Sequence, residues 1–416
     1  GPKTRRAVLV IVVVLCATLA AVRASDLVSN RYYLATMNET STFGMGPSWW
    51  FPEKAAAFIA REHVPGTTYN DYNLGGYLLW RLGPGYQDYI DGRALPFGPQ
   101  LFLRSGELSE LPPDSPEWQK EAERYGIKSI IVSLARYDGL GYFPNLRAFC
   151  AGDAWRPVYL DEVSAVFVRR LPETQSLIDR LQVNCNTAPL PAESTPPQSR
   201  AMAFNRAANA AAVLHALGRD AEAMAAVDGA LALFSGSGDA HHQRGMILAS
   251  LRRDDEALRE LQVAVELDPS QWTWWDLGDA YYRQRQLPEA LAAYQHAAQL
   301  ASHPQELWLR IGYLQLESGR PDEALQAFDR VAEAGPYRAL SVDKNRSFHG
   351  QLAEGRARAW FQRGDLARAV HFQKEAVGFT PDDPERWVGL AGLYRMQGNA
   401  AEAEKAMLRA TALRQH

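Results

Sequence analysis

The stretch Gln271–Pro304, QWTWWDLGDAYYRQRQLPEALAAYQHAAQLASHP, is the clearest copy of a 34-residue unit that recurs through the second half of the chain. Positions 8, 20 and 27 of the unit carry small residues, and positions 4, 11 and 24 carry large ones: here Gly278, Ala290 and Ala297, and Trp274, Tyr281 and Tyr294. Small residues let neighbouring helices approach closely, and large ones fill the space between them. The unit therefore predicts a packed pair of helices.

Five further windows share this phase, so about six copies cover residues 201–416. Their landmarks are Gly218, Ala223, Val227 and Ala230; Gly245, Leu248, Ala257 and Leu261; Trp308, Gly312, Gly319, Ala324 and Phe328; Trp360, Gly364, Ala369 and Ala376; and Trp387, Tyr394, Gly398, Ala403 and Ala410. The spacing resembles the tetratricopeptide repeat (TPR). That resemblance implies an all-α solenoid, in which each helix pair buries its apolar face on the next.

Two local features of this array carry expectations of their own. Gly or Arg occupies position 15 of the copies, where it is expected to end the first helix. The segment Tyr337–His349 breaks the period and predicts either a longer loop or an extended helix.

A concave wall is the expected binding surface, because TPR arrays line it with positions 2, 5, 9 and 12 of each first helix. In this chain those positions are Trp272, Trp275, Asp279, Tyr282, Leu309, Tyr313, Leu316, Arg358 and Phe361. They predict an apolar, aromatic groove with few charges. Three occupants are open: a segment of a partner protein, a sugar stacked on tryptophan, or the chain's own N-terminal domain. An alternative places Trp272 and Trp275 in the core between copies.

Near the N-terminus, Ala7–Val22 is an uncharged run, AVLVIVVVLCATLAAV, which Arg23 closes. As a helix it is about 24 Å long, against about 30 Å for the hydrocarbon core of a bilayer. We predict one transmembrane helix over residues 7–23; an uncleaved signal peptide and a core helix are the alternatives.

Basic residues precede this run, at Lys3, Arg5 and Arg6. The positive-inside rule therefore predicts that residues 1–6 are cytoplasmic. The rest of the chain is then expected on the periplasmic side of a bacterial inner (cytoplasmic) membrane, which it crosses once.

Residues 25–183 alternate short apolar runs with amphipathic stretches, which predicts a small mixed α/β (Rossmann-like) domain. The expected strands are Thr67–Asn70, Asp88–Ile90, a central Lys128–Leu134, and a hairpin of Trp155–Leu160 and Ala165–Arg169. The expected helices are Pro52–Glu62, Tyr77–Leu82 and Glu173–Val183. Residues 184–200 are rich in Pro, Ser and Thr and are expected to link this domain to the solenoid.

Four segments of this domain carry a second resemblance: Phe43–Ala60, Tyr69–Leu82, Ile90–Arg93 and Trp155–Arg170. They resemble the extracytoplasmic C-terminal domain of large bacterial membrane proteins of the GT-C glycosyltransferase type, similar to the dolichyl-phosphate-mannose protein mannosyltransferases. The resemblance implies a membrane helix that leads directly into the domain, and often a TPR tail. It also implies no catalytic residue here, because the family's catalytic acid lies in a loop between membrane helices that this chain lacks.

Polar residues at the ends of two predicted strands form a candidate site: Asn70, Asp71, Asp91 and Arg93. Strand ends of α/β sheets commonly present groups that bind ligands. In the alternative, Asp71 caps the next helix and Asp91 pairs with Arg93. The neighbouring Gly75-Gly76 pair allows either a close ligand or close packing of a helix on a strand.

Metal, cofactor and nucleic-acid motifs are not predicted. The formal net charge is −4 and the pI about 6.2, which argues against binding of a phosphate backbone. His241-His242 is interpreted as an exposed helix start rather than a ligand pair. Cys150 and Cys185 are a candidate disulfide in an oxidising compartment, with two free buried thiols as the alternative.

These features together predict a membrane-anchored extracytoplasmic scaffold, which holds other protein subunits in a membrane-associated complex. The alternative is the non-catalytic C-terminal part of a GT-C-type glycosyltransferase, handling an acceptor or a glycan.

Overall fold

The structure is a computed structural model that describes residues 2–28, 50–92, 98–135, 145–190, 200–335 and 342–415. Two units make up the chain, Gly1–Arg253 and Asp254–His416. Helices α9–α11 belong to the first unit together with the α/β domain. The domain bounds expected from the sequence stay predictions.

A four-stranded sheet, in the order β1-β2-β4-β3, organises the first unit. Its strands are β1 (Thr68–Asn70), β2 (Ser129–Ser133), β3 (Trp155–Leu160) and β4 (Ser164–Arg169). Strands β1 and β2 pair in parallel, and the other two strand pairs are antiparallel, so the sheet is mixed. Parallel pairing, which predominates in a Rossmann-like sheet, is therefore found in one of the three strand pairs. The central strand and the hairpin are confirmed. The strand expected at 88–90 is wrong, because only an isolated bridge joins Asp88 to Thr68.

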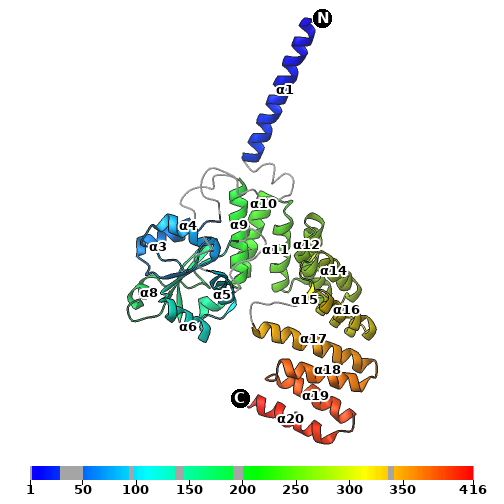
Figure 1. The fold of residues 1–416 in the computed structure, drawn as a ribbon. Coiled ribbons are helices and arrows are strands. Elements are labelled where there is room, and N and C mark those ends of the chain that lie inside the picture. The colour runs from blue at the N-terminus through cyan, green and yellow to red at the C-terminus, as the bar shows by residue number, and fades with distance from the viewer. Residues whose placement is uncertain are drawn as a thin grey trace. The chain divides into compact units, whose positions relative to one another are not determined.

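Side chains of the central strand alternate between two cores, as the pleat of a strand requires. Ile130 and Val132 pack in one core with Trp118 and Phe149, and Ile131 packs in the other with Leu74. The helices that supply the first core are α5 (Gly98–Glu110), α6 (Pro116–Tyr125), α7 (Leu146–Ala151) and α9 (Arg200–Ala216). The helices on the other face are α3 (Glu53–Glu62), α4 (Tyr72–Leu82) and α8 (Gln175–Leu181). The sheet thus lies between two helical layers (Figure 1).

The apolar N-terminal run lies in α1 (Pro2–Val28). Across the residues that the structure describes, no helix combines the length and the apolar character that crossing a membrane requires.

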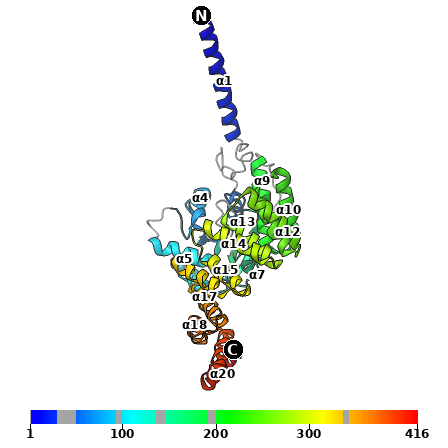
Figure 2. The same ribbon diagram turned by 90° about the vertical axis from the view of Figure 1, so that its right-hand side faces the viewer.

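The repeat region folds into two helices for each expected copy. They are α9, α10 (Asp220–Leu233), α11 (Gly238–Ser250), α12 (Asp254–Leu267), α13 (Gln271–Arg283), α14 (Leu287–Leu300), α15 (Gln305–Glu317), α16 (Pro321–Glu333), α17 (Val342–Gln362), α18 (Leu366–Phe379), α19 (Pro384–Met396) and α20 (Ala400–Arg414). In the second unit, consecutive pairs from α13 to α20 pack side by side (Figures 1 and 2).

Position 15 of every copy adopts a left-handed backbone conformation, which confirms its expected role in ending the first helix. The residues are Gly218, Arg252, Arg285, Gly319, Gly364 and Gly398, with φ between 60° and 83°. This conformation disfavours side chains with a Cβ, so the two arginines occupy strained positions.

Close approach at position 8 explains why that position is small. A Cβ on Gly312 would lie 2.2 Å from the ring of Phe328, and one on Gly278 would lie 2.6 Å from the ring of Tyr294. Both rings occupy position 24 and are buried. The predicted match of small and large residues is therefore confirmed in these two copies.

Candidate functional site

A pocket of about 480 Å³ lies in the second unit, where the first helices of three copies meet. It is lined by Trp275 of α13, by Glu306, Leu309, Arg310 and Tyr313 of α15, and by Lys344, Ser347, Phe348 and Gln351 of α17. Side chains three, four and seven residues apart share one face of a helix, so α15 and α17 each present one stripe to the pocket.

The α17 wall exists because that helix is longer than its counterparts. Helix α17 has 21 residues, whereas α13 and α15 have 13 each. The additional turns carry Lys344, Ser347 and Phe348. In the described part of the break, residues 342–349, the chain extends helix α17, one of the two expected alternatives, and supplies one side of the pocket; residues 337–341 of the break lie outside the described residues.

Arg310 is held in place from several sides. Its Nη1 lies 2.5 Å from Oδ1 of Asp279, and its Cζ lies 5.3 Å from the ring centre of Trp275 and 5.6 Å from that of Tyr294. The Tyr294 hydroxyl donates to the same Asp279 oxygen at 2.5 Å. Burial raises the pKa of Asp279, and the Arg310 charge opposes that shift. Because Asp279 and two aromatic rings fix it, the guanidinium is a preorganised donor at the edge of the pocket.

The two neighbouring tryptophans differ in exposure. Trp272 is 53% exposed, and its ring lies 6.3 Å from that of Trp275, at an angle of 28°. Trp275 is half-buried and packs against the apolar core of its repeat. The structure therefore places Trp272 on the surface and Trp275 between the core and the pocket.

The other predicted groove residues are spread along the array. Leu309 and Tyr313 line the pocket, and the Tyr313 hydroxyl donates to the backbone oxygen of Gln351 at 2.7 Å. Leu316 is buried in the core, and Tyr282 donates to Glu317 at 2.6 Å. Phe361 is exposed and does not line the pocket.

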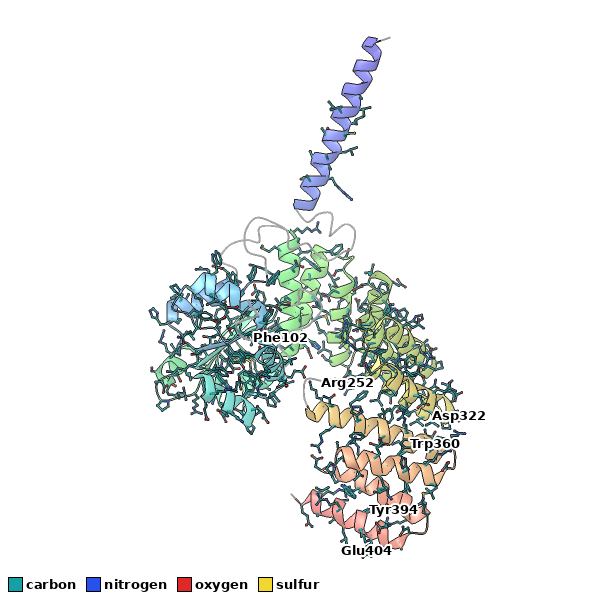
Figure 3. All side chains as sticks on the ribbon, viewed as in Figure 1. Phe102, Arg252, Asp322, Trp360, Tyr394 and Glu404 are labelled. Atoms are coloured by element: carbon teal, nitrogen blue, oxygen red, sulfur yellow. A yellow bond between two sulfur atoms is a disulfide. The ribbon has the colours of Figure 1, made fainter. Side chains whose placement is uncertain are left out.

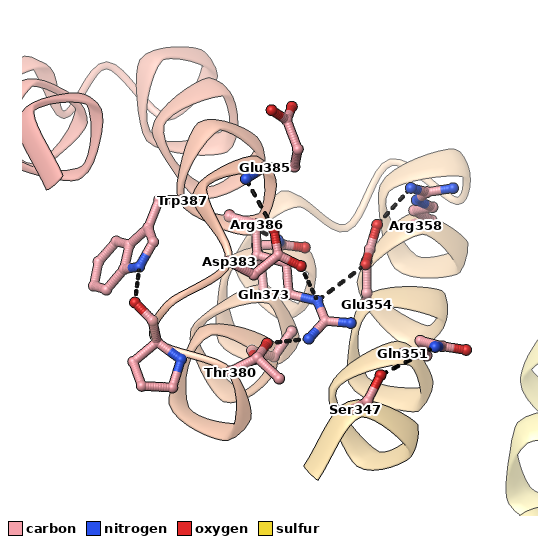
Figure 4. A network of polar contacts seen from close by, with 12 residues as sticks. Ser347, Gln351, Glu354, Arg358, Gln373, Thr380, Asp383, Glu385, Arg386 and Trp387 are labelled. Carbon is pink, nitrogen blue, oxygen red and sulfur yellow. Dashed lines mark hydrogen bonds and ion pairs between the residues drawn. The ribbon is translucent and has the colours of Figure 1, made fainter. Parts of the chain in front are cut away.

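Arg358 belongs to a separate ion-pair network (Figure 4). It pairs with Glu354, which also contacts Arg386 at 3.3 Å, and Arg386 lies 3.7 Å from Asp383. A Cβ on Gly350 would lie 2.2 Å from Nη1 of Arg386, so a larger residue there would require the arginine side chain to shift. The network ties α17 to α19.

A further tryptophan, Trp360, already has its ring covered by arginines. Arg363 and Arg368 lie 4.7 Å and 4.2 Å from its ring centre, and Arg363 pairs with Asp322 at 3.1 Å. Trp360, labelled in Figure 3, is not among the residues that line the pocket.

The expectation of few charges is wrong for the pocket, because Glu306, Arg310 and Lys344 line it. Ser347, Phe348 and Gln351 were also missed. Glu306 and Gln351 each occupy position 2 of their copy, so the same phase could have found them. Lys344, Ser347 and Phe348 lie in the extension of α17, whose register the break in the period hides. Arg310 occupies position 6, outside the positions used to predict the wall.

The candidate polar site at the strand ends includes Asn70 and Asp71, whose side chains hydrogen-bond to the backbone of the same domain. Asn70 donates to the Ile90 oxygen at 2.6 Å and accepts from the Tyr89 nitrogen at 3.0 Å. Asp71 accepts from the Ser133 backbone nitrogen at 2.6 Å and makes no capping bond to α4, so the capping alternative is wrong. Asp91 is buried, and Arg93 lies outside the described residues.

Glycine placement beside this cluster supports the packing interpretation. A Cβ on Gly75 would lie 2.2 Å from the Ile90 oxygen, whereas one on Gly76 would meet nothing within 4 Å. Gly75 is therefore required for close approach of α4 to residues 90 and 91.

Asp71 should make stability depend on pH. Burial raises its pKa from the ordinary 3.8 to about 6, so between these values the folded protein holds a proton that the unfolded chain releases. The stabilising contribution is complete below about pH 4 and is lost as the pH rises through 6. Relative to Asp71→Asn, we expect the wild-type chain to lose about 3 kcal/mol of unfolding free energy between pH 4 and 7. Urea titrations of both proteins across this range measure the difference, and parallel pH profiles would contradict it.

The candidate disulfide and the His241-His242 pair both lie in the first unit. Cys150 and Cys185 form a disulfide, with Cα atoms 6.0 Å apart. His241 and His242 lie near the start of α11, as expected, but His242 is buried rather than exposed.

Comparison with known families matches residues 275–339 to the tetratricopeptide repeat. Together with the paired helices, this match establishes a TPR array in the chain. A search of the curated proteins found no match.

Several solved structures are similar to part of this chain. A tetratricopeptide repeat protein from Parabacteroides merdae is 17% identical, with a TM-score of 0.43 over 50% of this chain and 79% of its own. YrrB, described as "a TPR protein with an unusual peptide-binding site", is 17% identical, with a TM-score of 0.36 over 45% and 91%. PilF of Pseudomonas aeruginosa is 16% identical, with a TM-score of 0.43 over 51% and 93%. The resemblance of the α/β domain to GT-C proteins stays a prediction.

Proposed function

We propose that this chain is a scaffold whose repeat array binds a segment of a partner protein in the pocket formed by α13, α15 and α17. The observation that carries the proposal is the pocket itself. Its floor is apolar, at Leu309 and Phe348, and its edge carries fixed polar groups, Arg310 above all. Apolar pockets with a few convergent polar groups are typical binding sites.

A peptide suits this pocket better than a sugar stacked on tryptophan. The Trp275 ring already contacts the Trp272 ring and the Arg310 guanidinium, which reduces the ring face that a sugar needs. A peptide instead offers an apolar side chain for the floor and backbone groups for the polar edge. Helical and extended peptides both bind protein grooves through such apolar and backbone contacts.

The second part of the proposal is that α1 anchors the chain in a bacterial inner membrane, with both units on the periplasmic side. Its support is the valine-rich stretch, whose side chains, such as Val13 and Leu19, are more than half exposed. Exposed apolar surface of this kind is expected to be covered. Protease added to intact spheroplasts should cleave within residues 184–200. Cleavage only after the membrane is opened would contradict this orientation.

Peptide selection tests the binding function directly. The full chain, in detergent, is immobilised and used to select from a random peptide display library, and selected peptides are titrated in solution. We expect sequences with a shared apolar residue and micromolar affinity, each of which competes with the others. The alternative, the non-catalytic part of a glycosyltransferase, predicts binding of oligosaccharides from a glycan panel and no enriched peptide.

A further inference from the structure

The turn that follows α8 connects the disulfide to the start of the repeat array within the first unit. The backbone oxygen of Asn184 accepts hydrogen bonds from the backbone nitrogens of Thr187 and Ala188, which closes the turn. Cys185 is only 3% exposed, and its bond to Cys150 ties this turn to α7. The turn is therefore fixed at one side by a covalent bond.

Arg219 holds the other side of this turn. It lies between α9 and α10, and only 6% of its side chain is exposed. Its Nη1 donates to the oxygens of Cys185 and Ala188, at 3.2 and 2.7 Å, while Nε and Nη2 donate to Glu222 at 2.8 and 2.5 Å. A buried guanidinium needs acceptors for its hydrogens, and the turn supplies two of them only in this conformation.

Two further contacts fix α9 to the α/β domain. Asn209 donates to the Leu134 oxygen at the end of β2, at 3.2 Å, and to the Glu162 oxygen in the turn of the hairpin. Val213 of α9 and Leu217, which follows the end of that helix, are buried in the same core as Phe149 and Cys185. The first helix pair of the array is thus packed on the sheet domain, and the disulfide lies beside the contact.

We infer that the Cys150–Cys185 disulfide is a redox-sensitive lock on the packing of α9–α10 against the α/β domain. While the bond is intact, the turn presents its carbonyl oxygens to Arg219. Reduction frees the turn from α7, so the backbone oxygens of Cys185 and Ala188 are no longer held where they accept from Arg219. The α9–α10 pair then opens more readily from the sheet domain.

The reductant must be a dithiol, such as a thiol–disulfide oxidoreductase or dithiothreitol. One thiolate attacks the sulfur of Cys150, the more exposed cysteine, to form a mixed disulfide, and Cys185 leaves as a thiolate that takes a proton. The second thiol of the reductant then displaces Cys150, which also ends as a thiol. Two electrons and two protons pass to the cysteines, and the dithiol becomes a disulfide.

Hydrogen exchange on the full chain tests the lock. Exchange of α9 and α10 amides is measured by mass spectrometry before and after treatment with dithiothreitol. We expect at least tenfold faster exchange in α9, α10 and residues 184–190 after reduction, with β2 and α13–α16 unchanged. Unchanged protection of α9–α10 would overturn the inference, and so would equal acceleration of β2, which would indicate loss of the whole domain.

Two variants separate the lock from general destabilisation. Arg219→Met keeps the apolar stem and the disulfide but removes the donors, so it should accelerate exchange of α9–α10 without reductant. The Cys150→Ser, Cys185→Ser double variant should exchange rapidly from the start and show no response to dithiothreitol. Wild-type protection of α9–α10 in Arg219→Met would overturn the role of the turn.

Discussion

Replacing Phe328 with alanine should lower the free energy of unfolding of the second unit by about 3–5 kcal/mol. The ring is fully buried and lies between Gly312 and Gly355, where added Cβ atoms would stand 2.2 and 2.5 Å from it. Neither glycine has a side chain that could move into the cavity. Denaturant unfolding of the full chain, with hydrogen exchange of α15–α17 as a local probe, measures the loss.

A matched control for this variant is Gly392→Ala in the middle of α19. A Cβ there meets nothing within 4 Å. Alanine is the better helix former, so the unit should be unchanged or more stable by up to about 1 kcal/mol. If Phe328→Ala costs less than about 1 kcal/mol, the close fit of positions 8 and 24 does not stabilise the array.

Trp275→Ala should weaken binding of a selected peptide by about 2–4 kcal/mol, or roughly 30- to 1,000-fold in Kd. This side chain forms the α13 wall of the pocket and supports the Arg310 guanidinium, whose Cζ lies 5.3 Å from its ring centre. Its removal therefore takes away an apolar contact and loosens the polar edge. Fluorescence anisotropy with a labelled peptide measures the change.

Two further variants test whether the loss of peptide affinity arises at the pocket. Trp360→Ala removes a tryptophan that the arginines cover outside the pocket, so affinity should stay within about twofold of wild type. Ser347→Trp adds bulk to the α17 wall without removing core and should block the peptide. Wild-type affinity in both Trp275→Ala and Ser347→Trp would show that peptides bind elsewhere.

The sequence was informative where a local rule repeats. Position 15 must leave the right-handed helix in every copy, and Gly or Arg does so each time, even at a cost for Arg252 and Arg285. The pairing of Gly278 with Tyr294 and of Gly312 with Phe328 follows from the same phase. Such features depend on neighbours at fixed spacing, so one sequence contains them.

Contacts between distant segments could not be predicted in this way. The bond from Ser133 to Asp71 spans 62 residues, and that from Asn209 to Leu134 spans 75. The polar edge of the pocket was missed for a related reason, because the extension of α17 shifts Lys344 and Ser347 out of the repeat register. Helical spacing predicts which residues share a face, but the partner of that face depends on the tertiary fold.

The central claim, that a partner segment binds in the pocket formed by α13, α15 and α17, is tested most directly by photo-crosslinking in intact cells. A photoreactive phenylalanine analogue is placed at position 272, which is 53% exposed beside the pocket, or at position 300 of α14, which is 51% exposed. We predict an adduct with one protein from position 272 alone, which is lost when Ser347→Trp is added and competed by a peptide from the crosslinked region. Identical adducts from both positions, or an adduct that survives the filled pocket, would contradict the account.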